Sequence, residues 1–206
     1  MSKDVNKTKG RILIEATELF CNNNYSKVTI KEISLNAKCN IAAINYHFQN
    51  KVELYCATIE QSYLETIDSF RQETVNLSDL EKLEALLDLR LDSALFPLAQ
   101  HSFSRLINQE MQNPSPVHDL IATQYLKPMF ERLKAIIKDY LGPKATDIQV
   151  QTASFMVRSI CIGMHITAMQ DEAFWLPHSQ VSVKNESKQF TINSIINYKK
   201  QIEGTH

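Results

Sequence analysis

A short stretch of small and amide-bearing side chains is the part of this sequence best suited to reading a surface by hydrogen bonds. Asn40, Ala42, Ala43 and Asn45 fall within six residues. An Asn side chain can form a bidentate pair with adenine, and an Ala methyl group can contact the methyl group of thymine. A helix with only such side chains on its outer face also has the low bulk that a DNA major groove requires. The stretch predicts contacts from these four residues to base edges.

Side chains suited to phosphate contact flank this stretch. Thr29, Lys38, Tyr46, His47 and Lys51 fall at expected helix ends and turns, where their polar groups can contact a DNA backbone. The structural alternative is that Tyr46 and His47 only close a helical bundle. We favour phosphate contacts for Tyr46 and Lys51.

Three expected helices must position these groups. An apolar stripe predicts a first helix over residues 8–21, ended by the Asn run at 22–24, because Asn tolerates a left-handed C-terminal position. Thr29 and Glu32 form a capping box that starts a second helix, whose buried face is Ile33 and Ala37. The stripe of the first helix consists of Ile12, Ala16, Leu19 and Phe20.

The third helix completes a tri-helical helix-turn-helix. Asn40 can cap it, and Ile41, Ile44 and Phe48 give it an apolar face. Two short capped helices separated by a tight turn, behind a first helix, are typical of this DNA-binding motif. A plain three-helix bundle would show the same periodicity, and the outer face of the third helix favours the motif.

The charge distribution agrees with an anion-binding head. Residues 1–55 hold eight Lys/Arg and five Asp/Glu, a net charge of +3, whereas the remainder carries −4. Lys3, Lys7, Lys9 and Arg11 precede or open the first helix, where a basic arm can follow a DNA backbone or enter the minor groove. Chance fluctuation of a few charges explains the split equally well on charge alone.

Composition narrows the classes of protein that remain. Of 206 residues, 44% are hydrophobic, 22% are charged and four are Gly. Such a content is typical of a globular protein, and so few glycines favour an all-α fold over strand-rich folds and Gly-rich phosphate loops. Four widely spaced Cys indicate neither a disulfide framework nor a zinc site, and no signal peptide or membrane span is expected. We expect a cytoplasmic protein without membrane contact, metal or cofactor.

Six further helices are expected, which gives about nine in all. A long helix over 51–76 leads from the head into the body, and Ser78 with Glu81 forms a second capping box. A helix over 117–141 is expected to kink or restart near Pro128 and to end at Gly142. The other helices are expected over 78–96, 101–112, 147–170 and 188–202. The loop between the last two contains Trp175, either as a lid or as an interface residue.

The body offers apolar residues for a ligand cavity but no catalytic motif. G-x-S-x-G, H-E-x-x-H and phosphate-loop patterns are absent from the sequence, so we expect no enzyme. A mostly apolar pocket with a few polar groups suits a drug-like or amphipathic molecule. Each residue taken singly is more often plain core. The candidate effector-binding residues are Phe103, Arg105, Met111, Tyr125, Met129, Met164 and His165.

The runs at 11–20 (RILIEATELF), 28–33 (VTIKEI) and 42–51 (AAINYHFQNK) resemble the TetR family of transcriptional regulators. The residues of the third run look most like those of the subgroup linked to cephalosporin and chloramphenicol sensitivity. The resemblance implies a DNA-binding domain at 1–51 and a helical domain at 52–206 for effector binding and dimerisation. It further implies a homodimeric repressor that binds a pseudo-palindromic double-stranded operator and is released by a small molecule.

Matching positions would make Tyr46, His47 and Lys51 backbone contacts, and would turn Asn40, Ala42, Ala43 and Asn45 toward bases. Three positions depart from the family pattern. Lys38 and Asn24 stand where the family usually has Gly, and Ser34 stands where it usually has Ala. A Lys forced to positive φ costs about 1 kcal/mol.

Two other functions fit parts of the sequence. Cys39 lies in the turn of the helix-turn-helix, where its oxidation could disturb the motif, although a small buried thiol is the commoner state. The second alternative is a helical enzyme or carrier whose head no longer binds DNA.

Overall fold

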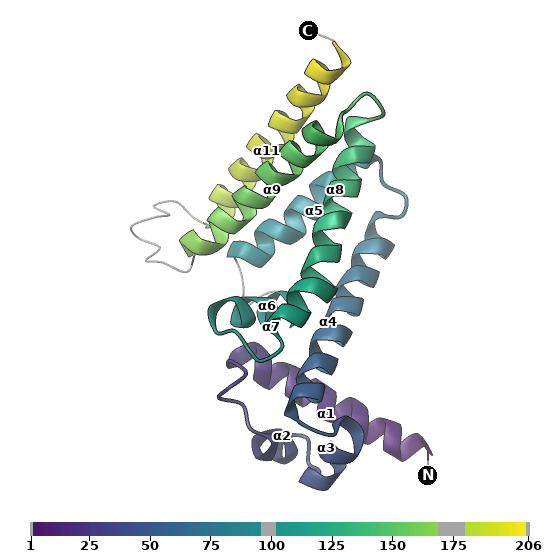
Figure 1. The fold of residues 1–206 in the computed structure, drawn as a ribbon, viewed down its shortest axis with the longest axis vertical. Helices are drawn as coiled ribbons and strands as arrows, with labels where there is room; N and C mark the ends of the chain where they lie inside the picture. Colours follow the sequence, from purple (N-terminus) through teal and green to yellow (C-terminus); the bar gives the residue numbers. More distant parts are fainter. Residues whose placement is uncertain (1, 96–101, 169–179, 205–206) are drawn as a thin grey trace. The chain divides into compact units, whose positions relative to one another are not determined.

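The computed structural model describes the backbone of residues 2–95, 102–168 and 180–204, and over those ranges every regular element is helical. The chain forms two compact units (Figure 1). Unit 1 comprises Met1–Ser69 and Gln100–Tyr125, and unit 2 comprises Phe70–Ala99 and Leu126–His206. The all-α prediction is confirmed.

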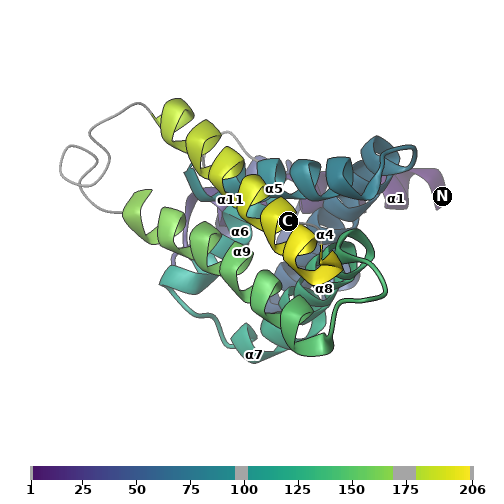
Figure 2. The same cartoon turned by 90° about the horizontal axis from the view of Figure 1, so that it is seen from above.

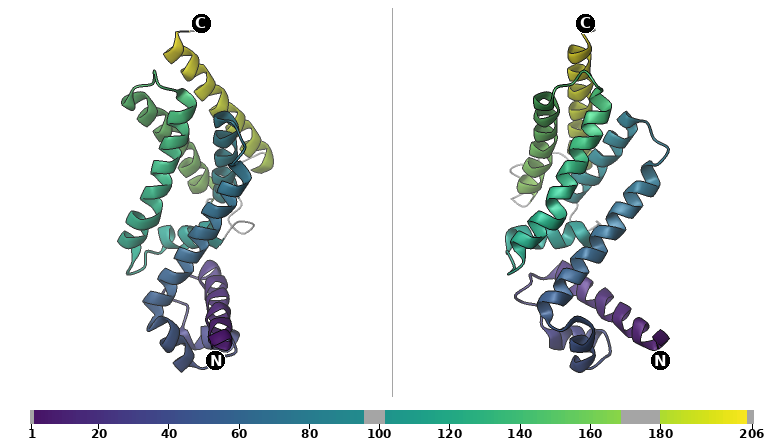
Figure 3. Two further views of the ribbon diagram at one scale, coloured as in Figure 1. Left: turned by 90° about the vertical axis from the view of Figure 1, so that its right-hand side faces the viewer. Right: turned by 45° about the vertical axis from the view of Figure 1, so that its right-hand side comes forward.

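The first three helices of unit 1 pack around one small core. These helices are α1 (Ser2–Asn22), α2 (Ile30–Asn36) and α3 (Ile41–Phe48), and each contacts the other two (Figure 3). The predicted stripe of α1 meets the apolar faces of α2 and α3, because Ile12, Ile33 and Ile44 are all fully buried. The tri-helical arrangement therefore follows from the apolar spacing in the sequence.

The structure corrects three local expectations in this core. Helix α1 begins at Ser2, so the expected basic arm is helical in its backbone. Ile41 is 44% exposed and lies off the apolar face of α3. Asn24 is absent from the residues with positive φ; its side-chain oxygen instead accepts hydrogen bonds from the Ser26 hydroxyl and the Lys27 N–H. A side-chain turn thus replaces the left-handed end expected of the Asn run.

Unit 1 continues into α4 (Lys51–Thr74) and is completed by α6 (Ser102–Gln112) and α7 (His118–Ile121). Glu110 is 2% exposed and accepts hydrogen bonds from the Tyr55 hydroxyl at 2.8 Å and from the Ser115 N–H at 2.8 Å. The His118 Nδ1 lies 3.1 Å from the same carboxylate. This buried carboxylate ties α6 to α4 and to the start of α7, and burial beside it raises the pKa of Tyr55.

The expected helix over 117–141 is divided by a π-turn. Segment η1 (Ala122–Leu126) separates α7 from α8 (Lys127–Leu141), and Pro128 follows directly. A proline supplies no N–H to the carbonyl four residues earlier, and its ring crowds that carbonyl. The wider π-turn accommodates both effects, which confirms the predicted break near Pro128.

Over its described residues, unit 2 packs helices around a core of mainly leucine, isoleucine and valine. Helix α5 (Asp79–Leu95) contacts α8, α9 (Asp147–Ala168) and α11 (Gln180–Glu203), and Figure 2 shows this group from above. The predicted capping box is present, since the Glu81 carboxylate accepts from the Ser78 N–H at 2.8 Å. The Gly142 cap also forms, with φ of 82°.

Ion pairs align the last helix on α5. The Lys184 ammonium lies 2.6 Å from the Asp92 carboxylate and 3.4 Å from Asp88, and Lys188 lies 2.6 Å from Asp88. Helix α11 starts at Gln180, which corrects the expected start at residue 188 and the expected loop up to 186. Trp175 lies outside the described residues. Among the helices that the structure describes, none is long and apolar enough to span a membrane.

Candidate DNA-binding site

The turn between α2 and α3 is a tightly bonded connection built on a left-handed lysine. The Cys39 N–H donates to the Ser34 carbonyl at 3.0 Å, and the Lys38 N–H donates to Leu35 at 3.2 Å. With Lys38 at φ 49°, these two bonds form a Schellman motif. Lys38 therefore adopts the backbone conformation that a Gly would take at this position, and its side chain is exposed beside α3.

Side-chain caps fix the start of both helices of the motif. The Thr29 hydroxyl accepts from the Glu32 N–H at 3.1 Å, and the Asn40 carboxamide oxygen accepts from the Ala43 N–H at 2.7 Å. The cap predictions for both residues are confirmed. The cap also constrains base reading by Asn40, because its oxygen is engaged and only its amide N–H groups remain to donate.

The outer face of α3 is open to solvent. Ala42, Asn45 and Tyr46 are exposed, Tyr46 by 77%, whereas Ala43 is half-buried. The His47 ring is half-buried and lies edge-on to Tyr46, with ring centroids 5.1 Å apart. Asn45 and Tyr46 are thus free to reach a groove and its rim, and His47 sits at the boundary between this face and the core.

A strained turn joins α3 to α4. Gln49 has φ 62° and ψ −55°, and the Asn50 N–H donates to the Phe48 carbonyl at 2.6 Å, which defines a γ-turn. The Asn50 side chain then accepts from the Glu53 N–H at 2.9 Å and caps α4. Sequence reasoning missed the positive φ because nothing in the residue type of Gln49 indicates it. It also missed the Asn50 cap, although Asn followed three residues later by Glu is a local signal for a helix start.

Lys51 points into unit 1. Its ammonium donates to the Tyr25 carbonyl at 2.5 Å and lies 4.2 Å from the centroid of the Tyr25 ring. Burial lowers the pKa of Lys51. A phosphate contact by Lys51 would have to replace this intramolecular contact, so Lys51 is less available than its position in the sequence suggests.

Two cations of α1 lie near α3, Lys9 at the end of that helix and Arg11 by the turn before it. The Lys9 ammonium lies 5.7 Å from the centroid of the Phe48 ring. Arg11 is close enough to Cys39 to oppose the effect of burial, which raises the pKa of that thiol. Together with the exposed Lys38, these side chains place positive charge near α3.

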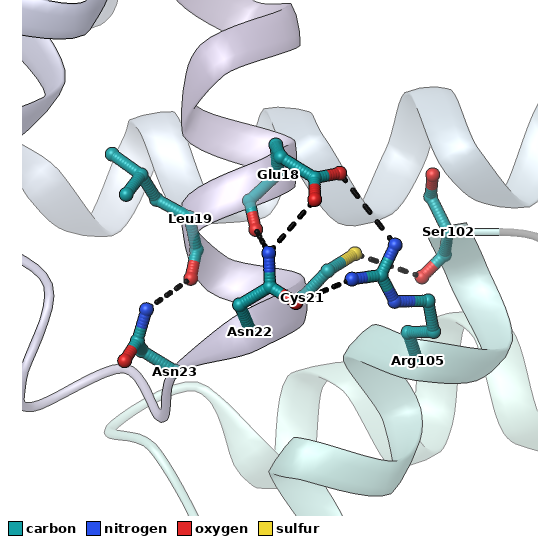
Figure 4. Close-up of polar contacts among 7 residues, drawn as sticks. All are labelled: Glu18, Leu19, Cys21, Asn22, Asn23, Ser102 and Arg105. Atoms are coloured by element: carbon teal, nitrogen blue, oxygen red, sulfur yellow. Dashed lines mark hydrogen bonds and ion pairs between the residues drawn. The ribbon is translucent and has the colours of Figure 1, made fainter. Parts of the chain in front are cut away.

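Helices α1 and α6 are joined by polar contacts at the end of α1 (Figure 4). The Arg105 guanidinium donates to the Asn22 carboxamide oxygen at 2.6 Å and lies 3.5 Å from the Glu18 carboxylate. The Cys21 thiol donates to the Ser102 carbonyl at 3.5 Å. Arg105, expected in a ligand cavity, is placed against α1 instead.

The other candidate effector residues fall in both units. Phe103 and Tyr125 are in unit 1, where their ring centroids lie 5.3 Å and 5.2 Å from that of Tyr63 and 6.4 Å from each other. Met111, also in unit 1, is 57% exposed. Unit 2 holds Met129, Met164 and His165, and the side chain of His165 lies outside the described residues. The structure brings together Phe103 and Tyr125.

An all-helical chain with a capped helix-turn-helix and an exposed second helix belongs to the broad class of helix-turn-helix DNA-binding proteins. Residues 12–58 match the family model for bacterial regulatory proteins of the tetR family. Residues 82–172 match the model for the C-terminal domain of the HTH-type transcriptional dual regulator CecR. The chain belongs to the TetR family of transcriptional regulators.

Similar proteins include two curated relatives and many solved structures. The chain is 24% identical over 124 residues to the probable HTH-type transcriptional regulator YttP of Bacillus subtilis, a match covering 60% of each protein. It is 22% identical to the HTH-type transcriptional activator FasR of Mycolicibacterium smegmatis over 89% of this chain and 79% of that one. The structure of the regulator FadR from Bacillus subtilis with stearoyl-CoA superposes with a TM-score of 0.67 at 16% identity, covering 88% of this chain and 96% of FadR. These likenesses agree with the fold of a TetR-family regulator.

Proposed function

We propose that this protein is a ligand-responsive transcriptional regulator that binds operator DNA through α3. The observation that carries the proposal is the solvent-exposed face of α3, held by caps at Thr29 and Asn40 and by the Lys38 turn. Asn45, Ala42 and Ala43 would contact base edges, with Asn40 donating from its amide. Thr29, Lys38, Tyr46, His47 and Lys51 would contact phosphates.

The acting form would be a homodimer joined through α9 and α11. Phe155 is 57% exposed on α9 and Phe190 is 68% exposed on α11, which is unusual for large apolar side chains. An apolar groove of about 270 Å³ lies between the two helices, lined by Met156, Tyr198 and their neighbours. A second copy would cover this face and present two α3 helices to major grooves about 34–36 Å apart on a pseudo-palindromic site.

A small molecule would control DNA binding. We propose a repressor that an effector releases, with a reciprocal coupling of about 1–3 kcal/mol between the two ligands. Phe103 and Tyr125 in unit 1 and Met129, Met164 and His165 in unit 2 remain the proposed effector residues. FadR with stearoyl-CoA is a precedent for ligand binding in this fold. We infer action in the cytoplasm, where bacterial operators lie, and no catalytic activity.

The test is a fluorescence-anisotropy titration of DNA from around the gene of this protein, at several salt concentrations, with scrambled DNA as the control. Binding about 10³-fold or more tighter than to scrambled DNA is expected of a specific regulator. Equal affinity for both DNAs, falling strongly as the salt concentration rises, would show that the chosen DNA does not contain the operator. No binding at low salt would overturn the proposal and favour the carrier or enzyme alternative.

The redox alternative gains no support from the geometry of Cys39. The thiol is half-buried, and burial raises its pKa, which disfavours the reactive thiolate. We therefore expect DNA binding to be insensitive to mild oxidants, and loss of binding that a reductant reverses would contradict this.

A further inference from the structure

Ile41 is an apolar residue on the solvent face of α3. The exposed residues within this helix are those at 41, 42, 45 and 46, whereas Ile44 and Phe48 are buried. Because each residue turns an α-helix by about 100°, the four exposed positions lie within about 140° of arc around its axis. Ile41 is 44% exposed, and it therefore shares one face with Asn45, which follows one turn later.

The core of α1, α2 and α3 closes without Ile41. Ile44 at 0% and Phe48 at 5% exposure already form the buried face of α3. The Asn40 side chain caps the helix through the Ala43 N–H at 2.7 Å. Helix propensity would favour Ala at position 41, since a β-branched side chain loses rotamer freedom in a helix. Neither packing nor helix formation thus calls for an isoleucine there.

The neighbours of Ile41 indicate a ligand, whereas a single exposed isoleucine would be common on a protein surface. Lys38 is exposed three residues before it, and the Lys9 ammonium lies 5.7 Å from the centroid of the Phe48 ring at the other end of α3. The exposed Asn45 amide lies on the same face. Positive charge, an amide and one apolar side chain together match the major groove of DNA. There the C5-methyl group of thymine is an apolar group among hydrogen-bonding base edges, between two anionic backbones.

The spacing of Ile41 and Asn45 relates their two contacts. Side chains four residues apart in a helix have Cβ atoms about 5–6 Å apart. Successive base pairs of DNA are about 3.4 Å apart. The bases that the two side chains reach should therefore lie within about two base pairs of each other, and Asn pairs best with adenine.

We propose that Ile41 determines operator specificity by contacting the C5-methyl group of a thymine, within about two base pairs of the base that Asn45 contacts. The inference rests on the proposed function and adds a base-reading residue to it. Because the contact is apolar, it selects the sequence and leaves the dependence of affinity on salt unchanged. Burial of one methyl group corresponds to about a fourfold gain in affinity, so two half-sites would gain about 15-fold together.

The experiment removes the thymine methyl group from the DNA. The full-length protein selects its preferred duplex from a pool with a random core of about 30 base pairs, which covers two half-sites one helical turn apart. In the selected duplex, each thymine and its symmetry mate are replaced by deoxyuridine, which lacks only the C5-methyl group. We expect replacement at one such pair of positions to weaken binding by roughly fivefold or more in fluorescence anisotropy.

Variants assign that methyl contact to Ile41. Ile41→Ala should reduce the deoxyuridine effect at that pair of positions to less than about twofold, while Ile41→Val should keep most of it. Ile14→Ala is the matched control, because Ile14 is an isoleucine of α1 that is 64% exposed, and it should behave as the wild type. Both alanine variants should unfold within a few degrees of the wild type, since each truncates an exposed side chain. All these proteins should share one salt dependence of DNA binding.

The outcomes separate the role of Ile41 from the proposed function. A deoxyuridine effect that persists in Ile41→Ala, or a selected duplex in which no thymine methyl group matters, would overturn the role of Ile41 alone. So would a large loss of thermal stability or a less steep salt dependence in Ile41→Ala, because either would show that Ile41 acts through the fold or through phosphate contacts. Failure of the wild type to select any sequence from the pool would overturn the proposed function itself.

Discussion

At the scale of single residues, the turn before α3 depends on one backbone angle. Lys38 holds φ at 49° in the Schellman motif, although lysine has a Cβ that disfavours this region. The ammonium at the end of that side chain is a candidate phosphate contact. Lys38 thus combines a backbone strain that costs stability with a charge that would favour DNA binding.

Lys38→Gly should separate these two effects. We expect the free energy of unfolding to rise by up to about 1 kcal/mol, since Gly adopts positive φ without strain. The dependence of log K on log salt for DNA binding should become less steep by about one, because one phosphate contact is lost. Chemical denaturation and anisotropy titrations measure the two quantities.

Lys27→Gly is the matched control. Lys27 is exposed in a turn and lies outside the residues with positive φ, so Gly should lower the free energy of unfolding there by roughly 0.4–1 kcal/mol through the greater freedom of the unfolded chain. A loss of stability in Lys38→Gly equal to that in the control would contradict the strain at Lys38.

Cys21 should make the fold sensitive to alkali. Burial raises the pKa of this thiol from its ordinary 9.0 to about 11, so the unfolded chain loses the proton first. The contribution of the protonated Cys21 thiol to the free energy of unfolding is therefore complete below pH 9. About 2–3 kcal/mol of it is lost as the pH rises through 11. Urea denaturation at pH 8, 9, 10 and 11 should show a steeper decline for the wild type than for Cys21→Ala. If the free energy of unfolding fell equally with pH in the wild type and in Cys21→Ala, Cys21 would not be the cause.

At the scale of elements, the helix starts were predictable because caps are encoded locally. Thr29, Asn40 and Ser78 each form the predicted bond to the helix they precede. The π-turn at 122–126 and the γ-turn at Gln49 could not be predicted from the residues that form them. The π-turn accommodates the following Pro128, and the γ-turn accommodates the junction between α3 and α4. Partners distant in sequence, such as Arg105 with Glu18 or Lys51 with Tyr25, also have no local signal.

Two substitutions at Asn40 should separate capping from base contact. Asn40→Ser keeps a good cap and should leave stability nearly unchanged, whereas Asn40→Ala should lose about 1 kcal/mol. Both remove the amide donor, so both should reduce the preference for operator over scrambled DNA. Thermal unfolding and competition anisotropy measure these effects. If Asn40→Ser kept the full preference for operator DNA, Asn40 would cap α3 without contacting a base.

At the scale of the whole molecule, α9 carries its apolar exposed residues in one stripe. Ile148, Phe155 and Ile162 follow at intervals of seven residues and are 68%, 57% and 49% exposed. The sequence predicts only that this helix has more apolar residues than one buried face needs. It does not indicate which face of the helix is left exposed. The boundary at residue 51, between a DNA-binding domain and a domain for effector binding and dimerisation, likewise stays a prediction.

Phe155→Glu should disrupt the proposed dimer. A charge in the stripe opposes burial against a second copy, yet in the monomer it replaces an exposed side chain, so the fold should persist. We expect sedimentation to show monomers and operator affinity to fall at least tenfold, while helical content is retained. Glu186→Gln, on an exposed polar position of α11, is the control. A dimeric Phe155→Glu protein would place the interface elsewhere.

The interleaving of the two units has a practical consequence for engineering. Residues 100–125 lie within the body in sequence but belong to unit 1, where α6 supplies Glu110 to Tyr55 and Arg105 to Asn22. A chimeric sensor made by a single crossover near residue 51 would separate Asn22 from Arg105, and it would replace Tyr55 and Glu110 together, so that the head would meet a foreign α6. Grafting this head onto another sensing body therefore calls for three crossovers, so that segment 100–125 travels with the head whose specificity is being transplanted.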